Sequence, residues 1–244
     1  MWDPWRGLLV AAGYTCQAIT LPGHEAAPGE PAPVGLGLLG IQDYVAAVQK
    51  VVESCPTPPI LIGHSMGGLI AQMVAAQGGQ ASGRKVAAVV GVNSAAPGAV
   101  FPLRPVTLPG TLRHFANPLL WRLPFRLNAW EARYLLFNAF DPATAEKMAS
   151  QIVFESGRVA WQIGFGPLNW AGSNRVDKSQ ITAPLLLLAG EKDRIVPIAA
   201  SRAVARWYGT QAASREYPQH AHWLLGEPGF EAVVQDALAW LKTV

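Results

Sequence analysis

Charged residues are scarce in this chain of 244 residues: only 14% are Asp, Glu, Lys or Arg, whereas 50% are hydrophobic. The basic residues outnumber the acidic ones by 19 to 16, which gives a formal net charge of +3, but they form no run of five or six. Such runs are typical of nucleic-acid binding, so we expect no nucleic-acid partner and only a mildly basic surface. The apolar fraction predicts a folded chain with a large core.

Cysteine is also rare, and two residues, Cys16 and Cys55, cannot make a disulfide framework in a chain of this length. There is no apolar run of about 18 residues, and no charged stretch followed by an apolar one as in a secretory leader. We therefore expect a cytoplasmic protein with no integral membrane segment. The length suits one α/β domain with room for an inserted subdomain.

Short apolar runs alternate with amphipathic stretches along the chain, which predicts βαβ units and a mostly parallel sheet flanked by helices. We expect strands at 14–20, 60–62, 86–92, 185–189 and 215–217, and helices at 3–12, 38–54, 67–77, 199–208 and 230–241. Residues 22–37 contain four prolines and four glycines, which predicts a loop.

The strand pattern gives way to short helical pieces between residues 98 and 180. Asn128 and Glu131 have the spacing of a capping box, and Asp141 followed by Pro142 is typical of a helix start. We expect a small helical insertion here. Its aromatic residues include Trp121, Phe125, Trp130, Phe137 and Phe140. They suggest a substrate with a hydrophobic acyl or alcohol group, although packing within the insertion explains them at least as well.

The strongest chemical signal is the stretch Gly63–His64–Ser65–Met66–Gly67, which stands between an expected strand and an expected helix. Small residues two positions before and after Ser65 permit a sharp turn that holds the serine hydroxyl exposed in a strained backbone conformation. The amide of Met66 would be one oxyanion-hole donor, and the helix N-terminus favours developing negative charge. Because the motif has a strand before it and a helix after it, we interpret it as a nucleophile elbow.

A serine nucleophile needs a base, and the base needs an orienting acid. Asp193 follows the strand expected at 185–189, at the sheet edge where α/β proteins place their sites, although it could be a solvated turn residue or a helix N-cap. Glu191 is a rival acid nearer the strand end. His222 follows the strand expected near Tyr217 and precedes the last helix.

A metal site is the main alternative for the histidines. His220 and His222 would share one face of a strand, but no third ligand with zinc-site spacing and no His-Glu-x-x-His pattern accompanies them. We therefore expect no metal and no organic cofactor. For His24, His64 and His114 we expect structural or surface positions.

These motifs together resemble the α/β-hydrolase superfamily, in its serine esterase and lipase-like branch, over nearly the whole chain. The resemblance rests on Leu21–Pro22–Gly23–His24, Gly63–Gly67, Gly190–Pro197, and His222–Trp223 before Glu227–Pro228. It implies a triad in the chain order Ser65, Asp193, His222. It also implies a core of residues 1–97 and 181–244 beneath a cap of residues 98–180. A His-Trp pair before the last helix is typical of the family and favours His222 over His220.

The resemblance implies a serine hydrolase that cleaves a small-molecule carboxylic ester, with a hydrophobic group, through an acyl-enzyme. Ser65 attacks the carbonyl, His222 takes and returns the proton, and Asp193 orients the imidazole. Two alternatives stay open, because a fold does not settle a reaction. One is another reaction on the same triad: C–C bond hydrolysis, lactone opening, acyl transfer or hydroxynitrile cleavage. The other is a non-catalytic ligand-binding member. No pattern bears on the oligomeric state.

One family feature is missing at the N-terminal end. Members usually have a strand ending in His-Gly before the helix that opens this chain, and its loop supplies the second oxyanion amide. No such segment precedes Trp2. Either the natural chain is longer or this one lacks half of its oxyanion hole. We predict that the 244 residues alone are poorly soluble or weakly active, because strand edges would stay unpaired.

Overall fold

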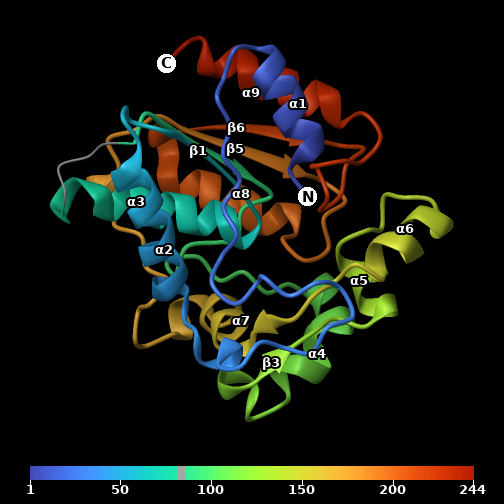
Figure 1. Cartoon of the computed structure of the whole chain (residues 1–244). Coiled ribbons are helices and arrows are strands. Elements are labelled where there is room, and N and C mark those ends of the chain that lie inside the picture. The colour runs from blue at the N-terminus through green and yellow to red at the C-terminus, as the bar shows by residue number, and fades with distance from the viewer. Residues whose placement is uncertain (82–85) are drawn as a thin grey trace.

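The computed structural model describes residues 1–81 and 86–244, and its centre is a four-stranded sheet of order β1-β2-β5-β6. The strands are β1 (Ile60–His64), β2 (Ala88–Val92), β5 (Leu185–Gly190) and β6 (Ala212–Tyr217). All three neighbouring pairs are parallel. The predicted parallel sheet with flanking helices is therefore confirmed (Figure 1).

The two central strands are apolar throughout because helices cover both faces of the sheet. On β2, Val89 packs into one core and Val90 into the other, since successive side chains point to opposite faces. The first core includes residues of α2 (Ile41–Ser54), α3 (Met66–Ala81) and α8 (Ile198–Tyr208), and the second includes residues of α1 (Asp3–Ala11) and α9 (Phe230–Leu241). Figure 1 shows the same division, with α1 and α9 on one side of the sheet.

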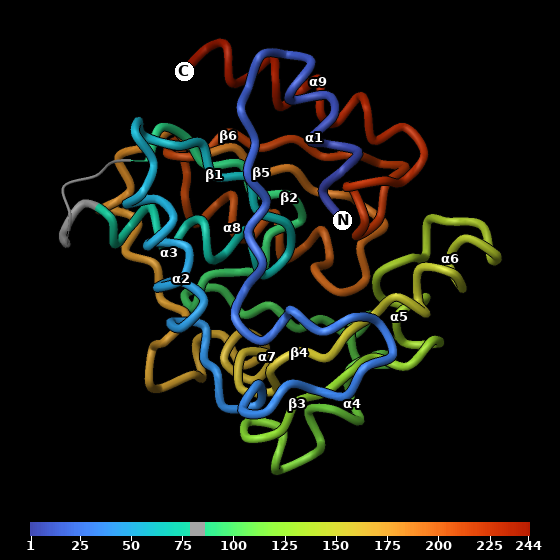
Figure 2. The backbone as a smooth tube through the Cα atoms, in the orientation of Figure 1, coloured from blue at the N-terminus to red at the C-terminus, as the bar shows by residue number. Residues whose placement is uncertain are grey.

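Residues 14–20 are not a strand, contrary to the prediction. Figure 2 shows them as an extended blue stretch that leads away from α1. Tyr14 and Cys16 pack against the second core and Ile19 against the first, so the apolar pattern reflects burial. A strand also needs a hydrogen-bonded neighbour along its edge. Among the described strands β1 pairs with β2 alone, and none pairs with residues 14–20.

Several element boundaries differ from the prediction by a few residues. The second helix begins at Ile41 rather than at 38, because Gly40 is extended and its amide donates to Asp43 Oδ2 over 2.7 Å. The strand expected at 215–217 begins at Ala212, where its pairing with β5 starts. Short 3-10 helices lie at Leu36–Leu38, Pro105–Thr107, Leu120–Arg122, Gly166–Leu168, Lys178–Gln180 and Gly209–Gln211.

Residues 98–180 form short elements between β2 and β5. They contain α4 (Leu108–Phe115), α5 (Ala129–Leu135), α6 (Pro142–Ala149), α7 (Gly157–Gly164) and the antiparallel pair β3 (Pro124–Phe125) and β4 (Glu155–Ser156). The capping box is confirmed: the Glu131 amide donates to Asn128 Oδ1 over 2.9 Å, and the Asn128 amide donates to Glu131 Oε2 over 2.8 Å. Asp141 accepts from the amides of Ala143 and Thr144, as its helix start predicts.

Glu155 of β4 ties this inserted segment to the rest of the chain. Its Oε1 accepts a hydrogen bond from the Tyr44 hydroxyl over 3.0 Å, and its Oε2 lies 3.1 Å from His24 Nε2. Burial opposes the protonation of His24, but the hydrogen bond to Glu155 and its charge outweigh burial, so the pKa of His24 is raised above 6.5.

In the ranges that the structure describes, no helix has both the length and the apolar character needed to cross a bilayer.

Candidate active site

Ser65 lies in the turn between β1 and α3, with a backbone φ of 54°. This left-handed conformation is uncommon for a residue with a side chain and indicates local strain. The Ser65 amide donates to the carbonyl of Val92 over 2.9 Å, and its carbonyl accepts from the amides of Gly68 and Ala95 over 3.0 and 2.9 Å. The turn is therefore anchored to the end of β2. Its geometry is the strand–turn–helix arrangement that the motif predicts.

The structure requires glycine at two positions of this turn, and one of them is not a position that the sequence analysis named. A Cβ at Gly63 would lie 2.1 Å from the carbonyl oxygen of Gly67, and a Cβ at Gly68 would lie 2.6 Å from Ser94 Cβ. A Cβ at Gly67 would meet nothing within 4 Å. The second position that must be glycine for steric reasons is therefore Gly68 rather than Gly67, because the third residue of α3 faces the chain just after β2.

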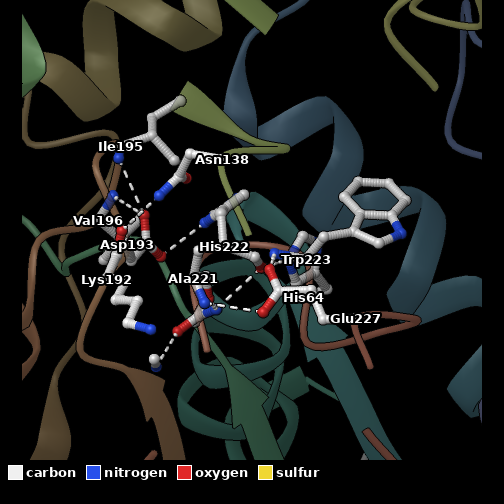
Figure 3. Close-up of polar contacts among 12 residues, drawn as sticks. His64, Asn138, Lys192, Asp193, Ile195, Val196, Ala221, His222, Trp223 and Glu227 are labelled. Carbon is white, nitrogen blue, oxygen red and sulfur yellow. Dashed lines mark hydrogen bonds and ion pairs between the residues drawn. The ribbon is translucent and has the colours of Figure 1, made fainter. Parts of the chain in front are cut away.

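His222 and Asp193 form a buried pair. The imidazole Nδ1 lies 2.7 Å from Asp193 Oδ2 (Figure 3). The other oxygen, Oδ1, accepts from the amides of Ile195 and Val196 over 2.9 and 2.8 Å, which leaves Oδ2 for the histidine. A carboxylate bonded to Nδ1–H selects the tautomer whose Nε2 carries no proton. That tautomer is the one a general base needs.

The rival residues lie elsewhere. Glu191 is exposed, and its Oε1 lies 3.5 Å from a terminal nitrogen of Arg202. His220 Nδ1 lies 3.3 Å from Glu227 Oε2, but without hydrogen-bond geometry. Within the described ranges, no group of three or more His, Cys, Asp and Glu side chains gathers as a metal site would. Of the candidate acids and bases from these two loops, Asp193 and His222 are therefore the two that bond to each other.

The topology of the sheet brings the three sequence-predicted residues to one edge. Ser65 follows β1, Asp193 follows β5, and His222 follows β6. These strands run parallel, so their carboxyl ends meet along the same edge, which is where open α/β sheets hold their sites. Met66 is the first residue of α3, so its amide is one of the four that lack a partner within the helix.

Asn93, which the sequence analysis did not single out, lies at the end of β2 and is fully buried. Its Nδ2 donates to the carbonyls of Ala221 and His222 over 2.7 and 2.8 Å. Its Oδ1 accepts from the amide of Gly190 over 2.7 Å. The only sign of Asn93 in the sequence is that a polar residue directly follows a continuous apolar strand. The hydrogen-bond partners of Asn93 are more than 90 positions away along the chain, so the sequence does not reveal them.

The sequence analysis used Glu227 only to mark the position of the His222–Trp223 pair. In the structure, Glu227 binds the backbone of the loop that carries His222. Its Oε2 accepts from the amide of Ala221, and its Oε1 accepts from the amide of Trp223, each over 2.7 Å (Figure 3). The carboxylate is buried. Residues 221–223 are therefore fixed through their amides by Glu227 and through two carbonyls by Asn93.

His64 has a structural role within this arrangement. Its Nε2 lies 2.8 Å from the carbonyl oxygen of His222. Burial, followed by the charge of His222, lowers the pKa of His64 to about 3. The ring is therefore neutral at ordinary pH and can donate from Nε2, which fixes its tautomer.

Four of the aromatic residues that the sequence analysis named in the inserted segment differ in their exposure. Phe137 is buried, and its ring lies 5.2 Å from that of Trp223 and 6.2 Å from that of Phe140. Trp130 is 49% exposed and Trp121 39% exposed. Packing therefore explains Phe137 and Phe140, and it places the inserted segment against the residue that follows His222.

A cavity of about 700 Å³ lies beside Asp193. It is lined by Arg104, Pro105, Val106, Asn138, Glu191, Lys192, Asp193, Arg194, Pro197, Ile198 and Ala199. Neither Ser65 nor His222 lines it. We therefore do not identify this cavity with the place where Ser65 would react.

Comparison with known proteins decides the family. A model of the alpha/beta hydrolase family matches residues 1–236. The chain belongs to the alpha/beta hydrolase family. This alpha/beta hydrolase is 26% identical to a monoacylglycerol lipase of Mycolicibacterium smegmatis over 233 residues, which cover 95% of this chain and 79% of that protein.

Solved structures agree with this family. A pyrethroid hydrolase from Sphingobium faniae gives a TM-score of 0.72 at 21% identity, over 99% of this chain and 91% of the other. A methylesterase from Arabidopsis gives a TM-score of 0.72 at 12% identity, over 100% of this chain and 93% of the methylesterase chain. The superfamily and fold predicted from the motifs are therefore confirmed, and the names of these relatives agree with the predicted carboxylesterase-like enzyme.

Proposed function

We propose that this alpha/beta hydrolase cleaves a carboxylic ester with a hydrophobic group, through an acyl-enzyme formed on Ser65. The observation that carries the proposal is the buried 2.7 Å pair of His222 and Asp193, at the same sheet edge as Ser65. A serine in a strained turn, a histidine of fixed tautomer and a buried carboxylate are the three parts of a hydrolytic triad.

In the proposed mechanism, Ser65 Oγ attacks the ester carbonyl while His222 Nε2 takes the hydroxyl proton. The amide of Met66 donates to the oxygen that becomes negative, and Asp193 stabilises the imidazolium. The tetrahedral intermediate collapses, and the alcohol leaves with the proton from His222. A water molecule then attacks the acyl group, its proton passes to His222 and on to Ser65, and the carboxylic acid leaves.

The inserted segment, residues 98–180, is proposed as a cap over a core of residues 1–97 and 181–244. Two contacts support this role. Asn138 Nδ2 donates to the carbonyl of Lys192 over 3.0 Å, and the ring of Phe137 contacts that of Trp223. The segment thus touches the loops that carry Asp193 and His222, so that it can shape what reaches them.

The substrate class is proposed from the relatives and from the cap. The relatives' names include a monoacylglycerol lipase, a pyrethroid hydrolase and a methylesterase. Large apolar side chains of the cap are exposed to solvent, among them Leu108, Leu112, Leu119, Trp121 and Leu123. Both observations favour an ester with a hydrophobic acyl or alcohol group.

A series of p-nitrophenyl esters from acetate to longer acyl chains tests the proposal. We expect turnover of the series, with kcat/KM rising as the acyl chain lengthens to a medium length, and no turnover by Ser65→Ala. Ser54→Ala, a change at an exposed serine near the end of α2, is the matched control and should behave as wild type. A folded wild-type protein that cleaves none of these esters would contradict ester hydrolysis.

A further inference from the structure

We propose that Asn93 is a positioning residue that holds the imidazole of His222 in place by joining three strand ends. The inference rests on the proposed function, because it assigns a role to Asn93 in the same site. Asn93 does not touch the reacting atoms; it acts through the backbone of the loop that carries His222.

The orientation of the Asn93 amide follows from its partners. Its NH₂ group faces two carbonyl oxygens, those of Ala221 and His222, and its oxygen faces the amide of Gly190. A flipped amide would place an oxygen against two carbonyls and a donor against a donor. Both hydrogens of the side chain and one acceptor position are therefore used in a site that excludes water.

The backbone of Asn93 has a requirement of its own. Its φ is 43°, in the left-handed region, which asparagine tolerates better than most residues with a side chain. Glycine would adopt this conformation but would supply none of the three hydrogen bonds. Asparagine thus meets the backbone requirement and the hydrogen-bond requirement of this position together.

The end of β2 is the common anchor of all three proposed triad members. The carbonyl of Val92 accepts from the amide of Ser65, and the next residue, Asn93, holds the carbonyl of His222. Asn93 also accepts from Gly190, three residues before Asp193. Two adjacent residues therefore fix the nucleophile turn, the acid loop and the base loop relative to one another.

The acid loop and the base loop lie in direct backbone contact. A Cβ at Gly190 would lie 2.3 Å from the carbonyl oxygen of Ala221, so the two backbones touch. Without the Asn93 side chain, the carbonyl of Ala221 and the amide of Gly190 would each lose this partner. The loop would then shift to regain hydrogen bonds, and the His222 ring would shift with it.

The test compares Asn93→Gly with the wild type, because glycine keeps the left-handed backbone and removes only the side chain. We expect kcat for a p-nitrophenyl ester to fall by about tenfold to a hundredfold, since a displacement of about 1 Å can cost that much, while KM stays within about twofold. Tyr208→Phe is the matched control, because it removes the buried hydrogen bond from the Tyr208 hydroxyl to Gln72 Oε1 and leaves all three hydrogen bonds of Asn93 in place. The Gln72 amide nitrogen also keeps its hydrogen bonds to Gly68 and Ser94 in this variant. Tyr208→Phe should leave kcat unchanged.

A second measurement does not depend on turnover. The proton between His222 Nδ1 and Asp193 Oδ2 should give a low-field proton NMR signal in the wild type and in Tyr208→Phe. We expect this signal to broaden or vanish in Asn93→Gly at a temperature where denaturant titration shows the variant folded. Asn93→Asp, which keeps the shape but sets an oxygen against the two carbonyls, should lose the signal as well.

The outcomes separate this inference from the proposed function. Wild-type kcat and an unchanged low-field signal in Asn93→Gly would overturn the positioning role, even if Ser65→Ala is inactive. Failure of both Asn93 variants to fold would also overturn it, by assigning Asn93 to the stability of the fold. Full ester turnover by Ser65→Ala would instead overturn the proposed function.

Discussion

His64 donates a hydrogen bond from Nε2 to the backbone carbonyl of His222 over 2.8 Å. The donor directly precedes the proposed nucleophile, and the acceptor belongs to the proposed base. Since the same carbonyl also accepts from Asn93, the loop of His222 is held by the ends of both β1 and β2. Burial keeps the His64 ring neutral, so we expect the folded protein to be sensitive to acid at this residue.

The first prediction concerns stability in acid. Burial, and then the charge of His222, lowers the pKa of His64 to about 3 in the folded protein, against 6.5 for an ordinary histidine. Below pH 6.5 the unfolded chain therefore gains a proton that the folded chain does not. This proton lowers the free energy of unfolding by up to about 1.4 kcal/mol per pH unit down to pH 3.

Denaturant titrations from pH 7 to pH 4 measure this effect. His64→Gln keeps an amide donor but does not titrate, so its stability should fall less steeply with pH than that of the wild type. Equal slopes for the two proteins would show that His64 is not the acid-sensitive group.

The second prediction distinguishes the two histidines of the last loop. His222→Ala should lose nearly all ester turnover, because the base is removed. His220→Ala should lose much less, because His220 lies beside Glu227 rather than Asp193. Steady-state kinetics of both folded variants is the measurement. Greater sensitivity at His220 would place the base two residues earlier than we propose.

The third prediction concerns the acid. Asp193→Asn keeps the shape of the side chain but should lower kcat by about ten thousandfold, because the amide favours the wrong histidine tautomer; this magnitude comes from other serine hydrolases. Glu191→Gln is the matched control, since Glu191 is exposed and lies near Arg202. A comparable loss in the control variant would transfer the role of the acid to Glu191.

The fourth prediction compares two neighbouring glycines of α3. Gly68→Ala should lower the free energy of unfolding by about 1–3 kcal/mol, because its Cβ would lie 2.6 Å from Ser94 Cβ. Gly67→Ala should be neutral or stabilising by up to about 1 kcal/mol, because its Cβ meets nothing within 4 Å and alanine favours a helix. Denaturant unfolding measures both; a reversed order would contradict the packing described for this turn.

The sequence predicted those features that depend on local pattern. The strand at Leu185–Gly190 is a short continuous apolar run, and the helix at Phe230–Leu241 has apolar residues on one face. Each element can therefore be recognised from its own residues. The turn at Ser65 was predictable because a sharp strand-to-helix turn needs small residues at fixed spacing. The pair of Asp193 and His222 was proposed because each residue follows an expected strand and because the family resemblance favours His222 over His220.

Features that depend on distant partners were not predictable in the same way. Residues 14–20 have the apolar pattern of a strand, but a pattern reports burial and not the presence of a hydrogen-bonded neighbour. Asn93 was missed because its three partners lie in two remote loops. The need for Gly68 rather than Gly67 depends on where Ser94 packs, and the motif itself contains no information about Ser94.

The most direct test of the central claim is covalent labelling with a fluorophosphonate, followed by mass spectrometry of the peptides. We predict one adduct, on Ser65, in the wild type and in Ser54→Ala, and none in Ser65→Ala. The Ser65→Ala protein should stay folded while its ester turnover falls on the order of a millionfold, as in comparable triads. An adduct on another serine, or full turnover by Ser65→Ala, would contradict the assignment of Ser65 as the nucleophile.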